Sequence, residues 1–398
     1  MIHFQLPRNS PNTYKQIRTT FEPESPKPVV SHALCSLLGD IKHRIDRKEH
    51  EWDAMKRYTN PYEYIHSVVP NKRKSIAINK PLSRSYFKMI ELMGFFKLLD
   101  FQEPEQSLRS FHLAEGPGGF IEALAHVRQN PQDKYIGMSI LDDRKDPNIP
   151  AWKKSKHFLQ ENPNVFIETG KDETGDILKL DNLDYCKDMY ARSMHIITGD
   201  GGFDFSVDFN NQENHISKLL FAQMVYALVM QKKGGHFILK MFDCFLEQTV
   251  DILSILSSCY GKVYITKPQT SRYANAEKYL VCKDFLAPPL DPMYPYLRTA
   301  MSNIITNTQN LSRLLLNKHD LLFMTKIEEY NAIFGQQQIG NIHSTLSLID
   351  TKPNNEKLNS LIKSHVQKCI SWCTKYNVLF NSHLCNTPQN NVFMFKTP

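Results

Sequence analysis

The 398-residue sequence contains no apolar run close to the roughly eighteen residues that a membrane-spanning helix needs. Its first residues, from Met1 to Pro7, lack a basic stretch followed by an apolar one, so we do not expect a secreted protein. The eight cysteines show no disulfide-framework spacing, which fits reduced thiols and predicts a cytoplasmic or nuclear protein. Internal repeats and low-complexity tracts are also absent. The formal net charge of +7 is a modest excess that permits a polyanionic partner without requiring one.

The chain divides into three regions that differ in their pattern of apolar residues. Residues 1–75 are predicted to form an N-terminal helical extension, because leucine and isoleucine recur at helical spacing after Ser31. Residues 76–290 alternate strand-like apolar runs with amphipathic segments, which predicts an α/β domain with a parallel, doubly wound sheet. A proline-rich break follows, and residues 291–398 are predicted to form a helical accessory region. The predicted strands are 110–115, 134–140, 164–168, 195–199, 236–241, 262–266 and 278–282.

A glycine turn, Glu115-Gly116-Pro117-Gly118-Gly119-Phe120, separates a predicted strand from an apolar helix. This context lets a ligand approach the backbone closely and face a helix N-terminus. The glycines are not spaced as Gly-x-Gly-x-x-Gly, and Pro117 lacks an amide, which disfavours a dinucleotide. A smaller adenosyl ligand with a charged amino acid tail fits better, with Glu115 as the partner of its ammonium group. The alternative is a tight turn with a purely structural role.

Four charged residues, Lys88, Asp200, Lys240 and Glu277, are predicted to meet in one site. Asp200 and Lys240 follow apolar strands, and ligands of open α/β sheets bind at the carboxyl ends of the strands. Two amines beside two carboxylates can lower the pKa of one amine while the charges balance. Lys240 could then take the proton of a ribose hydroxyl, or stay protonated and steer the hydroxyl towards an electrophilic methyl group. Each residue alone could instead be a solvent-facing charge at a strand end.

Together these segments resemble the FtsJ/RrmJ superfamily of RNA ribose 2′-O-methyltransferases over about residues 80–285, and most closely the cap-specific mRNA enzymes of eukaryotes and large DNA viruses. The matching segments are 114–120, 199–203, 234–243 and 267–279. The resemblance implies a Rossmann-like, S-adenosylmethionine-dependent sheet of about seven strands. It also implies that Lys88, Asp200, Lys240 and Glu277 are the catalytic tetrad.

The same resemblance implies the ligands. S-adenosylmethionine would contact Ser83, Glu115, Gly116, Pro117, Gly118, Gly119, Phe120, Asp176, Ile177 and Asp200. At Ser83 some relatives have asparagine, so the match is imperfect there. The implied substrate is the first transcribed nucleotide of capped RNA, and transcription or capping machinery are candidate partners. A viral member would act in the viral factory or the virion. The oligomeric state is not indicated.

Basic and polar residues near the tetrad are candidates for RNA contacts. Arg84, Ser271 and Arg272 flank tetrad members, and their side chains could reach phosphates. More distant lysine-rich candidates are 72–74, 153–156 and Lys267, although such clusters are usually solvated loops. A methylated guanine would stack on aromatic faces, but the chain has too many aromatic residues to select among them.

Cys369-x-x-x-Cys373 and His383-x-Cys385 raise the question of a zinc site. The spacing does not match common zinc patterns, and Cys369 and Cys373 lie one helical turn apart beside apolar residues. The pattern therefore favours the apolar face of a helix, and we expect no metal.

Three other functions are compatible with parts of the pattern. A ribosomal or other RNA 2′-O-methyltransferase would share the tetrad. A catalytically inactive, methyltransferase-like scaffold would bind RNA or a partner but would not need both Lys88 and Lys240. A nicotinamide dehydrogenase could use Asp142 or Asp143 as its acidic residue, yet its glycine pattern is absent.

Overall fold

The computed structural model describes residues 1–101, 107–141, 151–202 and 212–384. Asp142, Asp143, Phe203 and Cys385, all named above, lie outside these ranges. Contacts divide the chain into two units. Unit 1 comprises residues 1–48 and 81–343, and unit 2 comprises residues 49–80 and 344–398. In the described ranges no helix is both long enough and apolar enough to cross a membrane.

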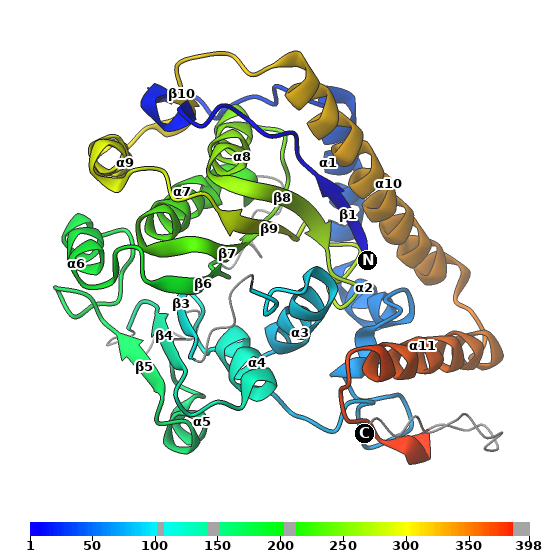
Figure 1. Ribbon diagram of the computed structural model, residues 1–398. Helices are drawn as coiled ribbons and strands as arrows, with labels where there is room; N and C mark the ends of the chain where they lie inside the picture. The colour runs from blue at the N-terminus through cyan, green and yellow to red at the C-terminus, as the bar shows by residue number, and fades with distance from the viewer. Residues whose placement is uncertain (102–106, 142–150, 203–211, 385–398) are drawn as a thin grey trace. The chain divides into compact units, whose positions relative to one another are not determined.

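The main sheet of unit 1 has eight strands in the order β1-β8-β9-β7-β6-β3-β4-β5 (Figure 1). Their bounds are β1 Ile2–Gln5, β3 Arg109–Leu113, β4 Lys134–Met138, β5 Val165–Glu168, β6 Met194–Gly199, β7 Gln231–Met241, β8 Tyr260–Lys267 and β9 Lys278–Phe285. Strands β3 to β7 pair in parallel, whereas β9 is antiparallel to β7 and β8. All seven strands predicted from the sequence are present, and β1 is an addition.

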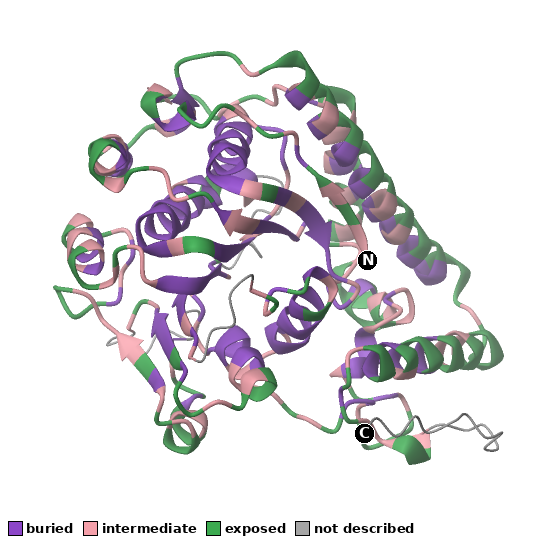
Figure 2. Ribbon diagram, in the orientation of Figure 1, coloured by how far each residue is buried: buried purple, intermediate pink, exposed green. Residues whose placement is uncertain are grey.

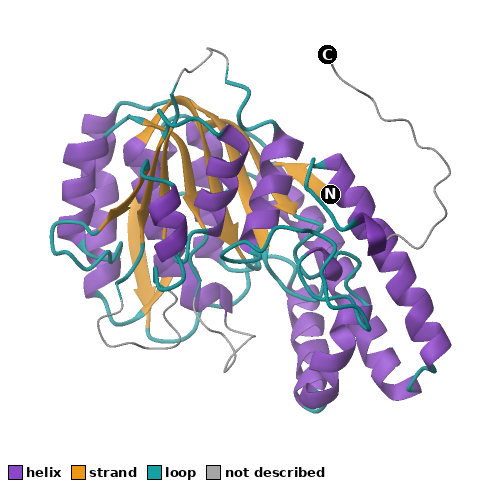
Figure 3. Cartoon of the chain, turned by 90° about the horizontal axis from the view of Figure 1, so that it is seen from below, coloured by secondary structure: helices purple, strands orange, loops and turns teal. Residues whose placement is uncertain are grey.

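Helices cover both faces of this sheet (Figure 3). One face carries α3, α4 and α5, and the other carries α6, α7 and α8 (Figure 1). Their bounds are α3 Ser85–Phe96, α4 Gly119–Arg128, α5 Lys156–Glu161, α6 Leu180–Tyr190, α7 Gln212–Met230 and α8 Glu247–Cys259. Because both faces are covered, the central strand β6 is buried along its whole length (Figure 2). Helix α7 is also buried almost all round, since it packs against α6, α8 and α9 (Leu290–Thr306).

Unit 1 includes parts of both regions that the sequence assigned to the N- and C-terminal additions. Residues 1–75 were expected to be a helical extension, but β1 extends the main sheet by antiparallel pairing with β8. β2 (Ile17–Glu22) pairs with β10 (Asn310–Leu315) in a second, two-stranded sheet. Helix α9 and β10 contribute the buried residues Leu297, Met301 and Leu314 to the main core. The boundaries between the two units lie at 48/49, 80/81 and 343/344. The regions predicted from the sequence had boundaries at 75/76 and 290/291.

The remaining helices are α1 (His32–Asp46), α2 (Glu49–Met55), α10 (Leu321–Thr351) and α11 (Asn355–Lys375). Within unit 2, α11 packs on the segment around Tyr64 and Ile65, and the bridge between Ala77 and Phe380 ties the two sequence segments together. Unit 2 is thus built from one piece that lies between β1 and β3 in the sequence and one that follows β9.

Candidate active site

The topology brings the four predicted charged residues to one edge of the main sheet. Asp200 directly follows β6, and Lys240 is the penultimate residue of β7, which runs parallel to β6. β9 is antiparallel to β7, so its first residues lie at the same edge, with Tyr279 opposite Lys240 and Glu277 just before the strand. Lys88 comes from the second turn of α3.

Hydrogen bonds join these residues into a continuous chain. Lys240 Nζ donates to the backbone oxygen of Asp200 at 2.6 Å and lies 3.5 Å from Asp200 Oδ1. The hydroxyl of Tyr279 donates to Asp200 Oδ1 at 2.9 Å. Lys88 Nζ lies 3.4 Å from that hydroxyl and donates to Glu277 Oε2 at 2.7 Å. Two ammonium groups and two carboxylates therefore share one edge with balanced formal charge.

The tetrad is largely shielded from water. The side chains of Lys88, Asp200, Lys240 and Glu277 are only 9%, 12%, 14% and 15% exposed. Burial alone would raise the pKa of Glu277, but the charges of Lys88 and Lys240 hold it well below its ordinary value. Glu277 is consequently an anion throughout the neutral range and supplies a fixed negative charge to the lysines.

Tyr279 was not singled out from the sequence, where it reads as one more core aromatic in a strand. It is fully buried, and burial together with the carboxylates of Asp200 and Glu277 raises its pKa well above its ordinary value. Its hydroxyl therefore keeps its proton and remains a donor to Asp200. Its position at the start of a strand, two residues after Glu277, was the available signal, because alternate residues of an extended chain face the same side.

Glu91 and Lys267 anchor the loop between β8 and β9, residues 268–277, through hydrogen bonds to its backbone. Glu91, fully buried on α3 one turn after Lys88, accepts hydrogen bonds from the backbone N–H groups of Gln269 and Thr270 at 2.8 and 3.1 Å. Lys267 Nζ donates to the backbone oxygens of Asn275 and Glu277 at 2.5 and 2.8 Å. These contacts fix the backbone that carries Glu277. Neither role had a local signal in the sequence.

The glycine turn stands at the same edge, between β3 and α4. Gly118 has φ of +99°, a conformation that suits glycine and strains other residues. A Cβ on Gly119 would come within 2.3 Å of Ser83 Oγ, so Ser83 lies directly against the turn. The backbone of Gly116 is equally crowded, by the carbonyl of Ala151 at 2.2 Å from such a Cβ.

Glu115 has a different role from the one expected. Its Oε1 accepts from the backbone N–H groups of Phe120 and Ile121 at the start of α4. Its Oε2 accepts from Thr198 at 3.1 Å and lies 3.0 Å from His112 Nδ1. Because the residue is 3% exposed and both oxygens have protein partners, Glu115 stabilises the turn and the helix N-terminus rather than offering a free carboxylate to a ligand.

The segment Thr174-Gly175-Asp176-Ile177 also lies near this edge. Gly175 packs against the backbone of Ser139, just after β4, and Leu141 donates to the carbonyl of Thr174 at 2.8 Å. Asp176 is half-buried, with Oδ1 accepting from the backbone of Leu178 at 2.8 Å, whereas the side chain of Ile177 is in the core. Asp176 is thus the charged group that this segment presents.

Trp152 is a second residue that the sequence did not single out. Its indole ring would meet a Cβ added to Gly118 at 3.1 Å or to Gly137 at 2.4 Å, so it covers both the glycine turn and the end of β4. The neighbouring Ser155 is fully buried and donates to the backbone oxygen of Pro117 at 2.6 Å. Ser155 therefore fixes the turn, and the lysines around it, Lys154 and Lys156, are exposed.

The candidate RNA contacts separate into two groups. Arg84 and Arg272 are half-buried next to the tetrad, and Arg84 donates to the backbone oxygen of Thr270 at 3.2 Å. Ser271 is buried and donates to Glu277 Oε1 at 2.6 Å, which gives it a structural role in the tetrad. Lys267 was considered for phosphate contact, but its amine is buried and bonded to backbone oxygens. It serves the loop instead.

Cys369 and Cys373 lie within α11. Cys369 and Cys373 are fully buried, and Cys369 Sγ contacts the backbone oxygen of Pro61 at 3.5 Å. Burial raises the pKa of Cys373 to about 12 and that of Cys369 further. Over the described ranges, no group of three His, Cys, Asp or Glu residues is placed to hold a metal ion.

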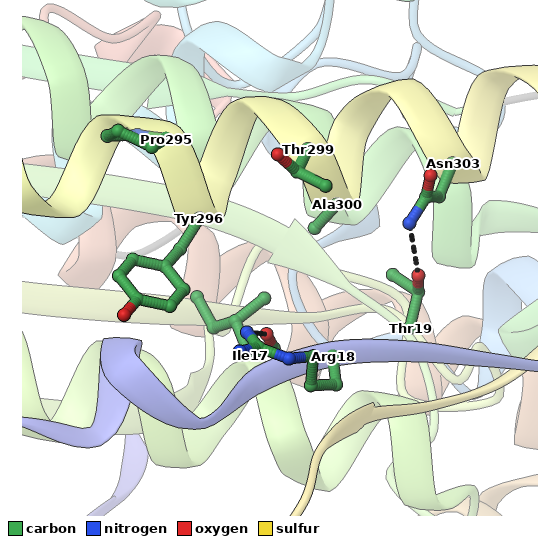
Figure 4. Close-up of a pocket in the computed structure, with 8 residues that line it drawn as sticks. All are labelled: Ile17, Arg18, Thr19, Pro295, Tyr296, Thr299, Ala300 and Asn303. Carbon is green, nitrogen blue, oxygen red and sulfur yellow. Dashed lines mark hydrogen bonds between the residues drawn. The ribbon is translucent and has the colours of Figure 1, made fainter.

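A cavity of about 350 Å³ opens elsewhere in unit 1, between β2 and α9 (Figure 4). Thr19 and Asn303 face each other across it with a 3.0 Å hydrogen bond. Arg18 lies over the ring of Tyr296 at 5.4 Å. We call the edge of the main sheet that carries Lys88, Asp200, Lys240 and Glu277 the charged edge. None of these residues lines the cavity, so it does not belong to the charged edge.

The sequence profile of FtsJ-like methyltransferases matches residues 81–285, which is about half of the chain and contains the whole charged edge. This chain belongs to the FtsJ-like methyltransferase family. The matched span begins just before α3 and ends with β9, so the family domain includes Lys88 as well as the sheet-edge residues.

Several curated relatives of this family member carry a more specific name. A cap-specific mRNA (nucleoside-2′-O-)-methyltransferase 2 from Pongo abelii is 29% identical over 362 residues, covering 84% of this chain and 44% of the relative. A cap-specific mRNA (nucleoside-2′-O-)-methyltransferase 1 from Trypanosoma brucei brucei is 31% identical, covering 62% of this chain and 66% of the relative. The corresponding enzyme 1 from Danio rerio is 34% identical, covering 68% and 33%.

The chain therefore spans about half the length, or less, of the animal relatives that it matches. These relatives come from animals and trypanosomatids, so they do not support the viral association that the sequence resemblance raised.

Proposed function

We propose that this chain is a cap-specific mRNA 2′-O-methyltransferase, which moves a methyl group from S-adenosylmethionine to the ribose 2′-hydroxyl of the first transcribed nucleotide. The observation that carries the proposal is the hydrogen-bonded chain Lys240–Asp200–Tyr279–Lys88–Glu277 at the ligand-binding edge of the sheet. Family membership supports the methyl-transfer chemistry, and the names of the relatives support capped mRNA as the substrate.

The residues of the edge suit the methyl donor. When bound, S-adenosylmethionine supplies an electrophilic methyl group attached to a cationic sulfur. The turn over 116–120 places its backbone at the carboxyl end of β3. Gly118 has φ of +99° in this turn, a conformation that glycine adopts without strain. Asp176 and Asp200 would hold the adenosyl part and the cationic part. Glu115 would act indirectly by keeping the turn and α4 in place.

Lys240 is the residue that would act on the ribose hydroxyl. Its amine is anchored to the backbone oxygen of Asp200 at 2.6 Å, so its position is defined before substrate arrives. As the new oxygen–carbon bond forms and the carbon–sulfur bond breaks, the hydroxyl proton must leave. Lys240 would either accept that proton or remain charged and orient the hydroxyl lone pair. Glu277, kept anionic by two lysines, would hold Lys88 and balance the site.

Methyl transfer to defined RNAs tests the proposal. The full chain is incubated with labelled S-adenosylmethionine and short RNAs that are capped, uncapped, or capped and already 2′-O-methylated on the first nucleotide. We expect label only on the capped, unmethylated RNA. Equal labelling of uncapped RNA would instead indicate an RNA 2′-O-methyltransferase of the ribosomal kind. Cofactor and RNA binding with no transfer to any RNA would indicate the catalytically inactive scaffold.

A further inference from the structure

Most of the net positive charge of this chain lies in unit 2. Residues 49–80 and 344–398 contain twelve Lys and Arg against six Asp and Glu, a formal charge of +6 out of +7 for the whole chain. Unit 1, which carries the candidate active site, is therefore nearly neutral. This imbalance cannot serve the chemistry of the tetrad, which is balanced by itself. A local excess of this kind favours a polyanionic partner for unit 2.

Unit 2 also contains a cavity of about 420 Å³, a size typical of ligand sites. One wall is a single stripe of α11, formed at helical spacing by Asn359, Ile362, Lys363, Val366 and Gln367. We call this cavity, which Leu384 also lines, the basic cleft. Asn359, Lys363 and Gln367 are exposed along this stripe, while Val366 is buried at its base. Much of α11 is solvent-exposed (Figure 2).

The other wall of the basic cleft is the turn over 69–74. Two backbone hydrogen bonds close this turn, from Val69 to the carbonyl of Lys74 at 3.1 Å and from Lys72 to the carbonyl of Val69 at 2.9 Å. Asn71, at the tip, adopts a left-handed conformation with φ of +61°. The closed turn presents Lys72 to the cleft, with Arg73 and Lys74 exposed beside it. None of the residues that line the cleft is acidic.

We propose that the basic cleft binds a single-stranded segment of RNA, with phosphates on Lys72 and Lys363 and one base in the cavity. The proposal rests on RNA being the substrate of this chain. The floor, Ile362 and Val366, offers apolar contact to a base face. The amide groups of Asn71, Asn359 and Gln367 offer both donors and acceptors to a base edge.

This combination favours RNA over an acidic peptide. A carboxylate-rich peptide would pair its carboxylates with the lysines and its backbone with the amides, but it would bring no flat face to the apolar floor. A nucleotide unit uses all three, because it carries a phosphate, a flat face and a polar edge. The cleft would thus hold part of the transcript outside the charged edge and raise the affinity of the enzyme for its substrate.

Fluorescence anisotropy with a short, labelled, uncapped single-stranded RNA tests the proposal, because such a probe needs no cap recognition. The variant Lys72→Glu/Lys363→Glu should bind about tenfold more weakly or worse. The slope of log affinity against log salt should become shallower by about 1.4, since each phosphate contact to single strands contributes about 0.7. In methyl transfer, the same variant should raise the KM for RNA and leave kcat unchanged.

The matched control is Lys357→Glu/Lys368→Glu, which makes the same charge change on exposed positions of α11 that do not line the cleft. An equal loss in the control would overturn the proposal, because only net charge would then matter. The proposal would also be overturned if the cleft variant bound the RNA with wild-type affinity. It would fail as well if poly-glutamate displaced the RNA and the Asn359→Ala/Gln367→Ala variant bound RNA like the wild type.

The same experiment separates this inference from the proposed function. If capped RNA is not methylated but the cleft variant still loses RNA affinity, the cleft assignment stands and the enzymatic proposal fails. If methylation occurs and both double variants bind RNA like the wild type, the enzymatic proposal stands and the cleft assignment fails. Circular dichroism melting confirms that each variant is folded, which is expected because all four lysines are exposed.

Discussion

The hydroxyl of Tyr279 donates a hydrogen bond to Asp200 Oδ1 at 2.9 Å, and this bond couples the two halves of the charged edge. On one side Asp200 meets Lys240, and on the other Lys88 lies within 3.4 Å of the same hydroxyl and pairs with Glu277. Without Tyr279, the two lysine–carboxylate pairs would be separate ion pairs. With it, the position of one pair constrains the other.

Tyr279→Phe should therefore slow methyl transfer by about tenfold or more, because a buried hydrogen bond to a charged group contributes about 1.5–3 kcal/mol. Single-turnover rates with saturating cofactor and capped RNA measure this effect. Tyr260→Phe is the control, since Tyr260 is equally buried but donates to Gln231, at the opposite end of β7 from Lys240. Equal rates for Tyr279→Phe and the wild type would remove Tyr279 from the site.

Lys240→Ala should lower kcat by about a hundredfold or more, the scale of general acid–base contributions. Cofactor affinity should change little, because the loss falls on the transition state. Lys233→Ala removes an exposed lysine from the opposite end of the same strand and should be neutral. Near-wild-type transfer by Lys240→Ala would discard the tetrad mechanism.

Lys240→Arg distinguishes the two roles proposed for Lys240. Arginine keeps the positive charge but does not deprotonate in this range. Substantial residual activity would therefore favour steering of the hydroxyl, whereas loss equal to that of Lys240→Ala would favour a general base. The measurement is kcat against pH for both variants.

Gly118→Ala should weaken S-adenosylmethionine binding, as measured by calorimetry, because a Cβ is strained at φ +99° and would crowd Trp152 at 3.1 Å. Gly234→Ala is a matched control. It also has a positive φ, of +76°, but a Cβ there would meet nothing within 4 Å, and it lies at the far end of β7 from Lys240. If both variants bind the cofactor like the wild type, the turn does not form the cofactor site.

Lys267 should make stability depend on pH above neutrality. Burial and the nearby charge of Lys278 lower its pKa from 10.5 to about 7. Between these values the unfolded chain binds the proton more strongly than the folded chain, so stability rises with pH from about 7 upward. Below about 7 the buried charge is present and its full cost applies.

Thermal melting of the wild type and Lys267→Met at about pH 6 and about pH 9 tests this linkage. The advantage of the wild type should be larger at the higher pH, where its neutral amine still donates to the carbonyls of Asn275 and Glu277. Lys154→Met, which removes an exposed lysine, controls for the loss of one charge. A difference that does not vary with pH would contradict the lowered pKa.

Seven strands of the main sheet, the glycine turn and the four charged residues could be predicted from the amino-acid sequence. The strands are apolar runs bounded by turns, and the glycine turn stands between a strand and a helix. Asp200 and Lys240 lie at the ends of apolar strands, whereas Lys88 and Glu277 were assigned through the family resemblance. Chain order then places such strand ends at a common edge when the strands are parallel. For these reasons Asp200 and Lys240 could be assigned together without coordinates.

The pairing of the N-terminal strand and the roles of Lys267, Glu91 and Glu115 could not be predicted from local patterns, because they depend on tertiary contacts. Pairing of Ile2 with Lys267 joins residues far apart in sequence, and no periodicity within 2–5 indicates it. Lys267 reads as a basic loop residue and Glu91 as a polar position on a helix, yet both are buried and bonded to the backbone around Glu277. Glu115 reads as a ligand group and proves to be committed to the start of α4. These outcomes depend on which groups meet after folding, because a buried polar atom must find its partner wherever the topology places one.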